Sequence, residues 1–269
     1  MFRIDEVPSN AKLRSLFRHA TFGKRVFCPR CGTSHIKQSE ARYRCPKCRR
    51  PFSLFSVSWL GCTKLSLRQI WILLQCWQAQ YTLPAASSMA SVSIITVRRW
   101  YGRFRRHLVY VSPEKFLGEV EVDESFVGRR RYKNQRIVLG AWCREEEKVI
   151  LRIVPNRSQG TTDRFLLEHI NEGSTVYTDS ATCYEGIDEF FGYIHEACNH
   201  SKFVFGPTNR IEGIWSILKR HIRRTYHHVW KEHLPQLLWE IEARINTPQM
   251  FRNPLTYLQS SLVVVPGGL

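Results

Sequence analysis

Three acidic residues in the second half of the chain have the types and spacing of a two-metal site. Asp123 lies in VEVDESFVG, Asp179 in VYTDS and Glu212 in NRIEGIWSILKRHIRR, with 55 and 32 residues between them. Three convergent carboxylates can hold two divalent cations about 3.5–4 Å apart, which activate an attacking hydroxyl and stabilise the leaving oxygen of a phosphodiester. Mg²⁺ or Mn²⁺ suits such oxygen ligands. A single Asp at a strand end is more often a turn former, so the hypothesis depends on all three acids together.

Basic residues accompany these acids. Glu212, Lys219 and Arg223 are separated by seven and four residues, so at 3.6 residues per turn they share one helical face. That face begins with a candidate metal ligand and continues with two cations that can grip DNA phosphate. A solvated stripe of charge is the alternative, and the two aspartates favour the first interpretation. A further basic run, which is expected in a loop over DNA or at a hairpin tip, comprises Arg129, Arg130 and Arg131.

Four cysteines in the first half of the chain form two C-x-x-C pairs. Cys28 and Cys31 are followed, after 13 residues, by Cys45 and Cys48. Four thiolates at this spacing are typical of a closed tetrahedral site for one structural Zn²⁺. A redox role for the pairs needs a βαβ context that the sequence lacks. The residues between the pairs have strand character, so we expect a zinc ribbon.

The composition is that of a basic, folded protein. The chain has 269 residues with 40 Lys and Arg against 23 Asp and Glu, a net charge of +17, and 43% hydrophobic residues. These values exclude a mainly disordered basic tail and allow one large or two modest domains. Since no apolar run reaches the roughly 18 to 20 residues of a membrane helix, and residues 1–10 contain no apolar signal segment, we expect an intracellular protein.

The excess of positive charge is confined to residues 1–118. This part has 21 Lys and Arg against 4 Asp and Glu, whereas residues 119–269 have 19 of each. Such asymmetry favours a polyanion, and nucleic acid in particular, as the partner of the first part. A basic surface that only maintains solubility is the alternative. The candidate DNA contacts within the expected ribbon are Arg42, Arg44, Arg49 and Arg50.

Residues 66–108 have helical periodicity. An amphipathic helix that ends before Pro84 is expected, then a short helix over 85–90, a turn over 91–93 and a second helix over 94–108. These lengths suit a helix-turn-helix, and a basic surface helix in a linker is the alternative. The expected packing face comprises Val92, Ile95, Val97, Trp100 and Phe104. Five arginines are expected to point away from it, the first three as groove contacts: Arg98, Arg99, Arg103, Arg105 and Arg106.

After Gly118 the pattern changes to strands. Three strand candidates, GEVEVDESFVG, RIVLGAWCR and KVILRIV, precede a helix over 161–171, a strand over 175–177, a helix over 183–190, a strand over 193–196 and helices from 209 onward. The order βββαβαβα, with the first three strands antiparallel, is that of the ribonuclease-H-like fold. In that fold acids on the first and fourth strands and on a late helix meet in space. We therefore expect a mixed α/β or α+β chain with a C-terminal ribonuclease-H-like catalytic domain.

Together these motifs resemble a known family. The ribbon, VEVDESFVGRR, VYTDS, NHS at 199–201, TNRIEGIWSILKRHIRR and EIEARIN are similar to transposases of the IS1595 and IS1016 group, with an ISXO2-like catalytic domain, and to their eukaryotic counterparts called Merlin. The resemblance covers about residues 17–246. It implies a DDE transposase in which Asp123, Asp179 and Glu212 hold the metals and Lys219 is a companion basic residue. Relatives vary between Asn and Glu at the third position, so Asn209 and His200 are further candidates.

The resemblance also implies partners and a location. Such a cut-and-paste enzyme binds double-stranded DNA at the terminal inverted repeats of a transposon, cuts it and joins the freed ends to target DNA. We expect a homodimer or higher oligomer on DNA, in bacterial cytoplasm or a eukaryotic nucleus. Two alternatives remain: a domesticated transposase that regulates without cleaving, and a nuclease or Holliday-junction resolvase of the same fold. The presence of all three acids favours retained catalysis.

These inferences divide the chain into five segments. We expect a helical lead-in over 1–26, the zinc ribbon over 27–62 and the helix-turn-helix region over 63–117. The catalytic domain is expected over 118–262 and a tail over 263–269.

Overall fold

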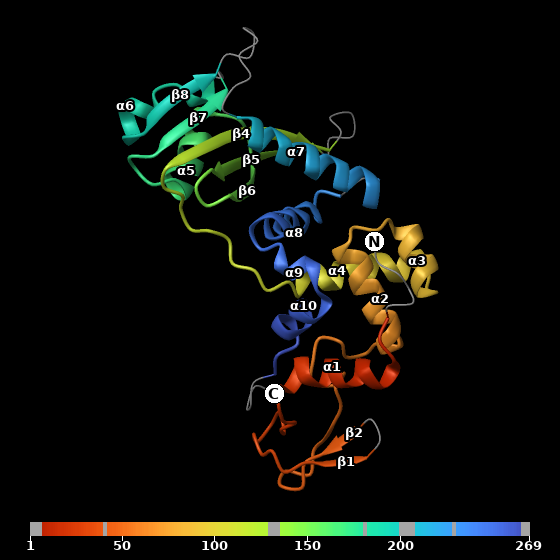
Figure 1. The fold of residues 1–269 in the computed structure, drawn as a ribbon. Helices are drawn as coiled ribbons and strands as arrows, with labels where there is room; N and C mark the ends of the chain where they lie inside the picture. Colours follow the sequence, from red (N-terminus) through yellow and green to blue (C-terminus); the bar gives the residue numbers. More distant parts are fainter. Residues whose placement is uncertain are drawn as a thin grey trace. The chain divides into compact units, whose positions relative to one another are not determined.

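The chain forms two units in the computed structural model, which describes residues 7–39, 42–128, 135–179, 182–198, 208–227 and 230–264. The first unit comprises residues 1–109 together with 249–269, and the second comprises residues 110–248 (Figure 1). The chain therefore passes between the units twice. Residues after 248, which the sequence assigns to the catalytic domain up to 262, group with the N-terminal unit instead. No helix within the described ranges is long and apolar enough to cross a membrane.

A small sheet stands near the start of the first unit. It has three antiparallel strands, β1 (Lys37–Ser39), β2 (Arg42–Arg44) and β3 (Pro51–Phe52), in that order. Tyr43 and Phe52 stack with ring centroids 5.4 Å apart, and both pack against Phe22 of helix α1 (Asn10–Phe22). Because side chains alternate along a strand, burying Tyr43 leaves the arginines on either side of it exposed.

Three capped helices follow, α2 (Leu67–Gln78), α3 (Leu83–Ala90) and α4 (Ile94–Arg106), near the predicted bounds. Ser66 and Gln69 form a capping box at the start of α2, and the side chains of Thr82 and Ser93 accept backbone N–H groups at the starts of the other two. Ser91 adopts a left-handed conformation with φ 51°, which turns the chain between α3 and α4.

Two side chains of α4 differ from the predicted pattern. Ile95, expected in the packing face, is 73% exposed, and Arg105, expected to point outward, is buried. At about 100° per residue, Arg105 lies at the edge of the face that contains Val97, whereas Ile95 lies on nearly the opposite side of the helix from Val97, so the helical repeat itself places Ile95 outward. The inner face does contain Val97, Trp100 and Phe104.

The last two helices, α9 (Gln249–Arg252) and α10 (Pro254–Ser261), complete the first unit. The Tyr257 hydroxyl donates to the carbonyl of Phe104 over 2.8 Å, and Gln78 Nε2 donates to the carbonyl of Met250 over the same distance. The indole of Trp59 donates to the carbonyl of Ser261. Helices α2 and α4 and the segment between β3 and α2 are thus bonded to residues from the end of the chain.

The second unit is built on a five-stranded sheet in the order β6-β5-β4-β7-β8. Strand β5 is antiparallel to both β4 and β6, whereas β7 runs parallel to both β4 and β8. This confirms the predicted three antiparallel strands followed by crossover strands. The bounds are β4 (Glu119–Val127), β5 (Arg136–Cys143), β6 (Lys148–Val154), β7 (Thr175–Asp179) and β8 (Ile194–Cys198).

Helices cover both faces of this sheet (Figure 1). Val120 and Val122 of β4 face a core completed by α5 (Gln159–His169), the 3₁₀ turn η3 (Thr182–Tyr184) and α6 (Ile187–Phe191). Val127 faces the opposite core, which α7 (Asn209–His221) and α8 (Leu234–Asn246) complete. Because side chains alternate, the odd-numbered residues of β4 face α7.

The acids of the EIEARIN motif hold α8 in place. Glu242 is buried and accepts from the backbone N–H of Leu151, the Tyr110 hydroxyl and the Arg152 guanidinium over 2.8, 3.1 and 2.9 Å. Glu240 is also buried and pairs with Arg244 over 2.8 Å. Since buried carboxylates need such partners, these two acids are structural.

Candidate active site and metal-binding residues

Strand pairing sets Asp123 and Asp179 side by side. In the parallel pair of β4 and β7, Glu119 lies opposite Thr175 and Glu121 lies opposite Tyr177. The paired residues end there, and Asp123 and Asp179 each follow two residues later on their strands; the charge of Asp179 acts on Asp123, so the two carboxylates are close. Partners in register project to the same face of a sheet, so both carboxylates point to the face that α7 covers. The two acids are thus neighbours although 55 residues separate them.

Asp123 is partly buried and is held by α7. The indole Nε1 of Trp215 donates to Asp123 Oδ2 over 2.9 Å. The pKa of Asp123 is raised to about 6, chiefly because the carboxyl is buried; the hydrogen bond from Trp215 lowers this pKa, and repulsion from Glu124 and Asp179 raises it. A bound cation would offset this cost of burying charge and would displace the proton. The chemistry of this donor pair therefore fits a hard divalent cation.

The neighbouring Glu124 belongs to the opposite face. Its Oε1 accepts from Arg157 Nε over 2.5 Å, and its Oε2 accepts from the Tyr184 hydroxyl over 3.0 Å. Burial raises the pKa of Glu124, while the Arg157 charge lowers it. Both oxygens are engaged in this network on the α5 side. Of the two adjacent acids in the sequence, Asp123 is therefore the one directed toward α7.

A third acid of β4, Glu121, fixes the start of α7. Glu121 Oε2 accepts the backbone N–H groups of Arg210 and Ile211 over 2.9 and 3.1 Å. Arg144 Nε donates to the other oxygen over 3.0 Å. A helix begins with N–H groups that have no partner inside the helix, so this buried carboxylate acts as a cap supplied by the sheet. Sequence reasoning missed Glu121, although its position two residues before Asp123 places it on the same strand face.

Breaking this cap is expected to destabilise the protein. Glu121→Ala leaves two N–H groups of α7 without their carboxylate and removes one of the two carboxylates that pair with Arg144, so the free energy of unfolding should fall by about 3 kcal/mol. Urea denaturation of the full chain measures it. Glu119→Ala is the matched control, because Glu119 also pairs with Arg144 but is about half exposed, and its loss should cost less than about 1 kcal/mol. Equal losses in the two variants would show that the buried cap has no special role.

The start of α7 carries the other predicted site residues. Glu212 is exposed in its first turn, and Thr208 Oγ1 donates to Glu212 Oε1 over 3.4 Å. Asn209 is the first residue of the helix and is also exposed. Glu212 and Trp215 are three residues apart, so they lie on neighbouring positions of the helix surface, and Trp215 contacts Asp123.

The three acids do not form one closed cage. Over the ranges that the structure describes, the one group of three or more His, Cys, Asp or Glu side chains whose ligand atoms all lie within 4.8 Å is a cysteine cluster. Asp123, Asp179 and Glu212 therefore do not all lie within that spacing of one another. Because Glu212 is exposed on a helix end, rotation about its side-chain bonds can change its distances to the two aspartates without a change of fold.

The basic residues that follow Glu212 lie in two elements, α7 and the turn after it. Lys219 is exposed, two turns after Glu212 on the same helix. Arg223 lies past the end of α7 in a π-helical turn, η5 (Ile222–Tyr226). Arg223 is exposed, as Glu212 and Lys219 are, and a face shared by these three side chains stays a prediction. Arg129, Arg130, Arg131 and His200 lie outside the described residues.

The candidate DNA contacts of the first unit are exposed with one exception. Arg103 differs because its guanidinium donates to the carbonyls of Trp59 and Gly61 and lies 4.8 Å from the centre of the Trp100 ring. Burial and the charge of Arg106 lower the pKa of Arg103. These contacts tie Arg103 to its own unit, so we do not retain it as a groove contact. The exposed arginines are Arg42, Arg44, Arg49, Arg50, Arg98 and Arg99.

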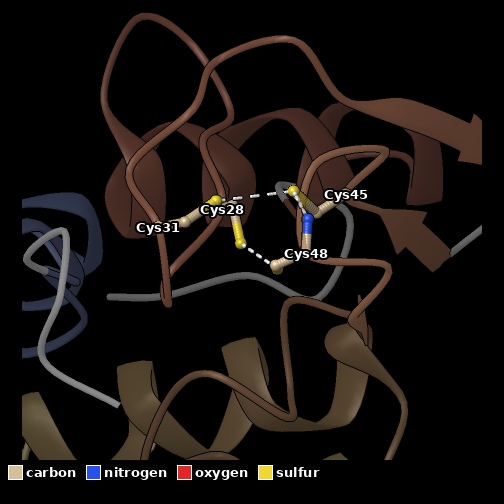
Figure 2. Close-up of side chains that lie close together, drawn as sticks. All are labelled: Cys28, Cys31, Cys45 and Cys48. Atoms are coloured by element: carbon tan, nitrogen blue, oxygen red, sulfur yellow. Dashed lines mark hydrogen bonds between the residues drawn. The ribbon is translucent and has the colours of Figure 1, made fainter.

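Four cysteines converge at the small sheet (Figure 2). All four Sγ atoms lie within 4.8 Å of one another, and the pairs Cys28–Cys48 and Cys31–Cys45 are each 3.5 Å apart. A tetrahedral zinc ion with Zn–S bonds of about 2.3 Å requires sulfurs about 3.8 Å apart, so this group fits Zn²⁺. Burial opposes ionisation of Cys45, but hydrogen bonds from the Cys48 backbone and the other thiols lower its pKa to about 7.

Two tight turns bring these cysteines together. The Cys28 N–H donates to the carbonyl of Thr33, and Gly32, with φ 71°, supplies the left-handed residue of the first turn. In the second turn the Cys45 N–H donates to the carbonyl of Arg50 over 3.0 Å, and Arg49 has φ 61°. Each C-x-x-C pair thus directs two sulfurs to one point.

Comparison with known proteins gives one family. A family model for the ISXO2-like transposase domain matches residues 115–246. An "Uncharacterized transposase-like protein" of Haemophilus influenzae is 32% identical over 106 residues, which are 38% of this chain and 85% of that protein.

Two solved structures are similar over part of the chain. The catalytic core domain of BIV integrase has a TM-score of 0.31 and 12% identity, covering 52% of this chain and 85% of its own. A simian T-cell lymphotropic virus intasome in complex with PP2A regulatory subunit B56 gamma has a TM-score of 0.35 and 10% identity, covering 68% of this chain and 75% of its own. Both scores are low, and the fold is defined by the strand order described above.

Proposed function

Because the chain belongs to the ISXO2-like transposase family, of the IS1595 group, we propose that it catalyses metal-dependent DNA strand cleavage and strand transfer in cut-and-paste transposition. The observation that carries the proposal is the register of β4 and β7. It sets two carboxylates side by side on a sheet face, under a helix that carries a third.

In this proposal Asp123, Asp179 and Glu212 hold two Mg²⁺ or Mn²⁺ ions. When bound, the ions activate the attacking hydroxyl and stabilise the leaving oxygen of the phosphodiester. Lys219 projects from the same helix as Glu212 and neutralises a DNA phosphate next to the reacting one. Glu121 holds the first turn of α7, which keeps Glu212 close to the sheet. Asn209 and His200 stay candidates for the third ligand.

The first unit supplies DNA recognition in this proposal. The cysteine cluster holds one structural Zn²⁺, and the ribbon around it contacts phosphates through its exposed arginines. Helices α3 and α4 act as a helix-turn-helix, with α4 entering the major groove. The DNA sites are the terminal inverted repeats and the target. Because two transposon ends must be joined together, we propose a homodimer or higher oligomer on DNA.

Replacing arginines of α4 is expected to change sequence preference. Arg98→Ala and Arg99→Ala should each lower affinity for the end sequence by about 5- to 150-fold, the equivalent of 1–3 kcal/mol for a base contact. Arg42→Ala should weaken binding to all sequences. It should also reduce the slope of log affinity against log salt concentration by about 1, the change expected for the loss of one phosphate contact. Gel shifts of an end duplex and a scrambled duplex over a salt series measure both. Arg103→Ala is the control on the same helix and should lower stability rather than preference. Equal losses on both duplexes for Arg98→Ala would refute the recognition role of α4.

The proposed activity is tested with a labelled duplex that contains a transposon end. Purified full-length protein is expected to nick this duplex when Mg²⁺ is present and to shift it in a gel without nicking when Mg²⁺ is absent. Shifting without nicking in Mg²⁺ and Mn²⁺ would instead favour a protein that binds DNA as a regulator.

A further inference from the structure

Trp215 connects the catalytic helix to the first aspartate. It is 5% exposed, and its ring packs in the core between α7 and the sheet, with Ile211 and Leu218 on either side along the helix. Its one polar atom, Nε1, donates to Asp123 Oδ2 over 2.9 Å. A buried indole N–H needs a partner, so the carboxylate and the indole each restrict the orientation of the other.

A glycine in the neighbouring strand makes this contact possible. Gly140 of β5 lies opposite Asp123 in the antiparallel register. A Cβ atom at Gly140 would lie 2.7 Å from the Trp215 ring and 2.9 Å from the Ile211 side chain, closer than van der Waals contact. The absence of a side chain at Gly140 therefore leaves room for the indole against β5, beside Asp123. Gly140 of β5 and Trp215 of α7 therefore together orient the carboxylate of Asp123 on β4.

We propose that Trp215 is a positioning residue that holds one oxygen of Asp123 so that the other is presented to a divalent cation. This rests on the proposed function, in which Asp123 is a metal ligand. A free aspartate can rotate about its Cβ–Cγ bond and sample many orientations, and the indole removes part of that freedom before the metal arrives. Hydrogen bonds to ligating carboxylates tune metal sites in this way, and their loss typically costs 10- to 100-fold in affinity or activity.

The test compares Trp215→Phe with Trp142→Phe in the full chain. Phe keeps most of the ring but has no N–H, so Trp215→Phe should weaken Mn²⁺ binding, followed by electron paramagnetic resonance without DNA, by about 10- to 100-fold. Cleavage should fall by a similar factor with unchanged DNA binding. Trp142 packs against the same core, so its variant controls for lost packing and should keep Mn²⁺ affinity and cleavage near wild type. Equal losses in the two variants, or unchanged Mn²⁺ affinity in Trp215→Phe, would overturn the proposal.

A measurement on the wild-type protein does not depend on how a variant folds. Substoichiometric Mn²⁺ should broaden the indole N–H resonance of Trp215 before those of the other tryptophans, because its hydrogen lies on the carboxylate that binds the ion. Suppose that the Trp215 resonance stays sharp in the wild-type protein, while Asp123→Asn abolishes Mn²⁺ binding. That result would refute the role of Trp215 and leave Asp123 as a metal ligand. Wild-type Mn²⁺ affinity in Asp123→Asn would instead refute the metal site, and with it the proposed function.

Discussion

Asp123→Asn and Asp179→Asn are each expected to lower DNA cleavage and strand transfer by about 1,000-fold or more, with DNA binding near the wild-type level. The amide has the shape of the acid without its charge, so it removes a metal ligand with little change in packing. Metal ions contribute several kcal/mol of transition-state stabilisation in phosphoryl transfer, and each 1.4 kcal/mol corresponds to about a factor of ten in rate. Both reactions should fail together because one site performs them.

The measurement is cleavage of a labelled terminal-repeat duplex in Mg²⁺, with a gel shift to check folding. Glu124→Gln is the matched control, since Glu124 is adjacent in sequence but pairs with Arg157 on the other face of the sheet. It should affect stability far more than the rate of cutting. Wild-type cutting by Asp123→Asn or Asp179→Asn would overturn the mechanism. Wild-type cutting by Glu212→Gln alone would move the third ligand to Asn209 or His200.

The purified protein is expected to contain one zinc ion per chain, and its removal should unfold the small sheet. Structural zinc sites contribute about 10–16 kcal/mol of apparent binding energy, which is also folding energy for the segment that they organise. Cys28→Ser, or a strong chelator, should therefore disorder residues 28–48 and reduce DNA binding sharply. The sheet of the second unit has its own core and should remain folded.

Elemental analysis gives the zinc content, and limited proteolysis with circular dichroism locates the loss of structure. Cys62→Ser is the control, because Cys62 is an exposed free cysteine outside the cluster and should leave zinc content and DNA binding unchanged. A preparation that is folded, binds DNA and contains no zinc would contradict this prediction.

The sequence predicts local structure well where that structure is determined by residues close together in the chain. The strands of the second unit follow from alternation of apolar residues, and the four cysteines follow from two short motifs. The relation of Glu121 to α7 depends on a contact between residues 89 positions apart, which no local pattern reports. The same holds for Arg103, whose sequence neighbours suggest DNA but whose guanidinium is held by Trp59. The face of Glu124 also became clear only from its partners Arg157 and Tyr184.

The return of the chain to its first unit has a consequence for biosynthesis. Helices α9 and α10 supply contacts to α2 and α4 of the N-terminal unit, and both are made only after residues 110–248 have been synthesised. Domains generally fold as units while the ribosome extends the chain from its N-terminus. Here the N-terminal unit stays incomplete until nearly the whole chain has emerged from the ribosome. The second unit, residues 110–248, can complete its folding first. A product that terminates before residue 249 therefore lacks the helices that complete the N-terminal unit.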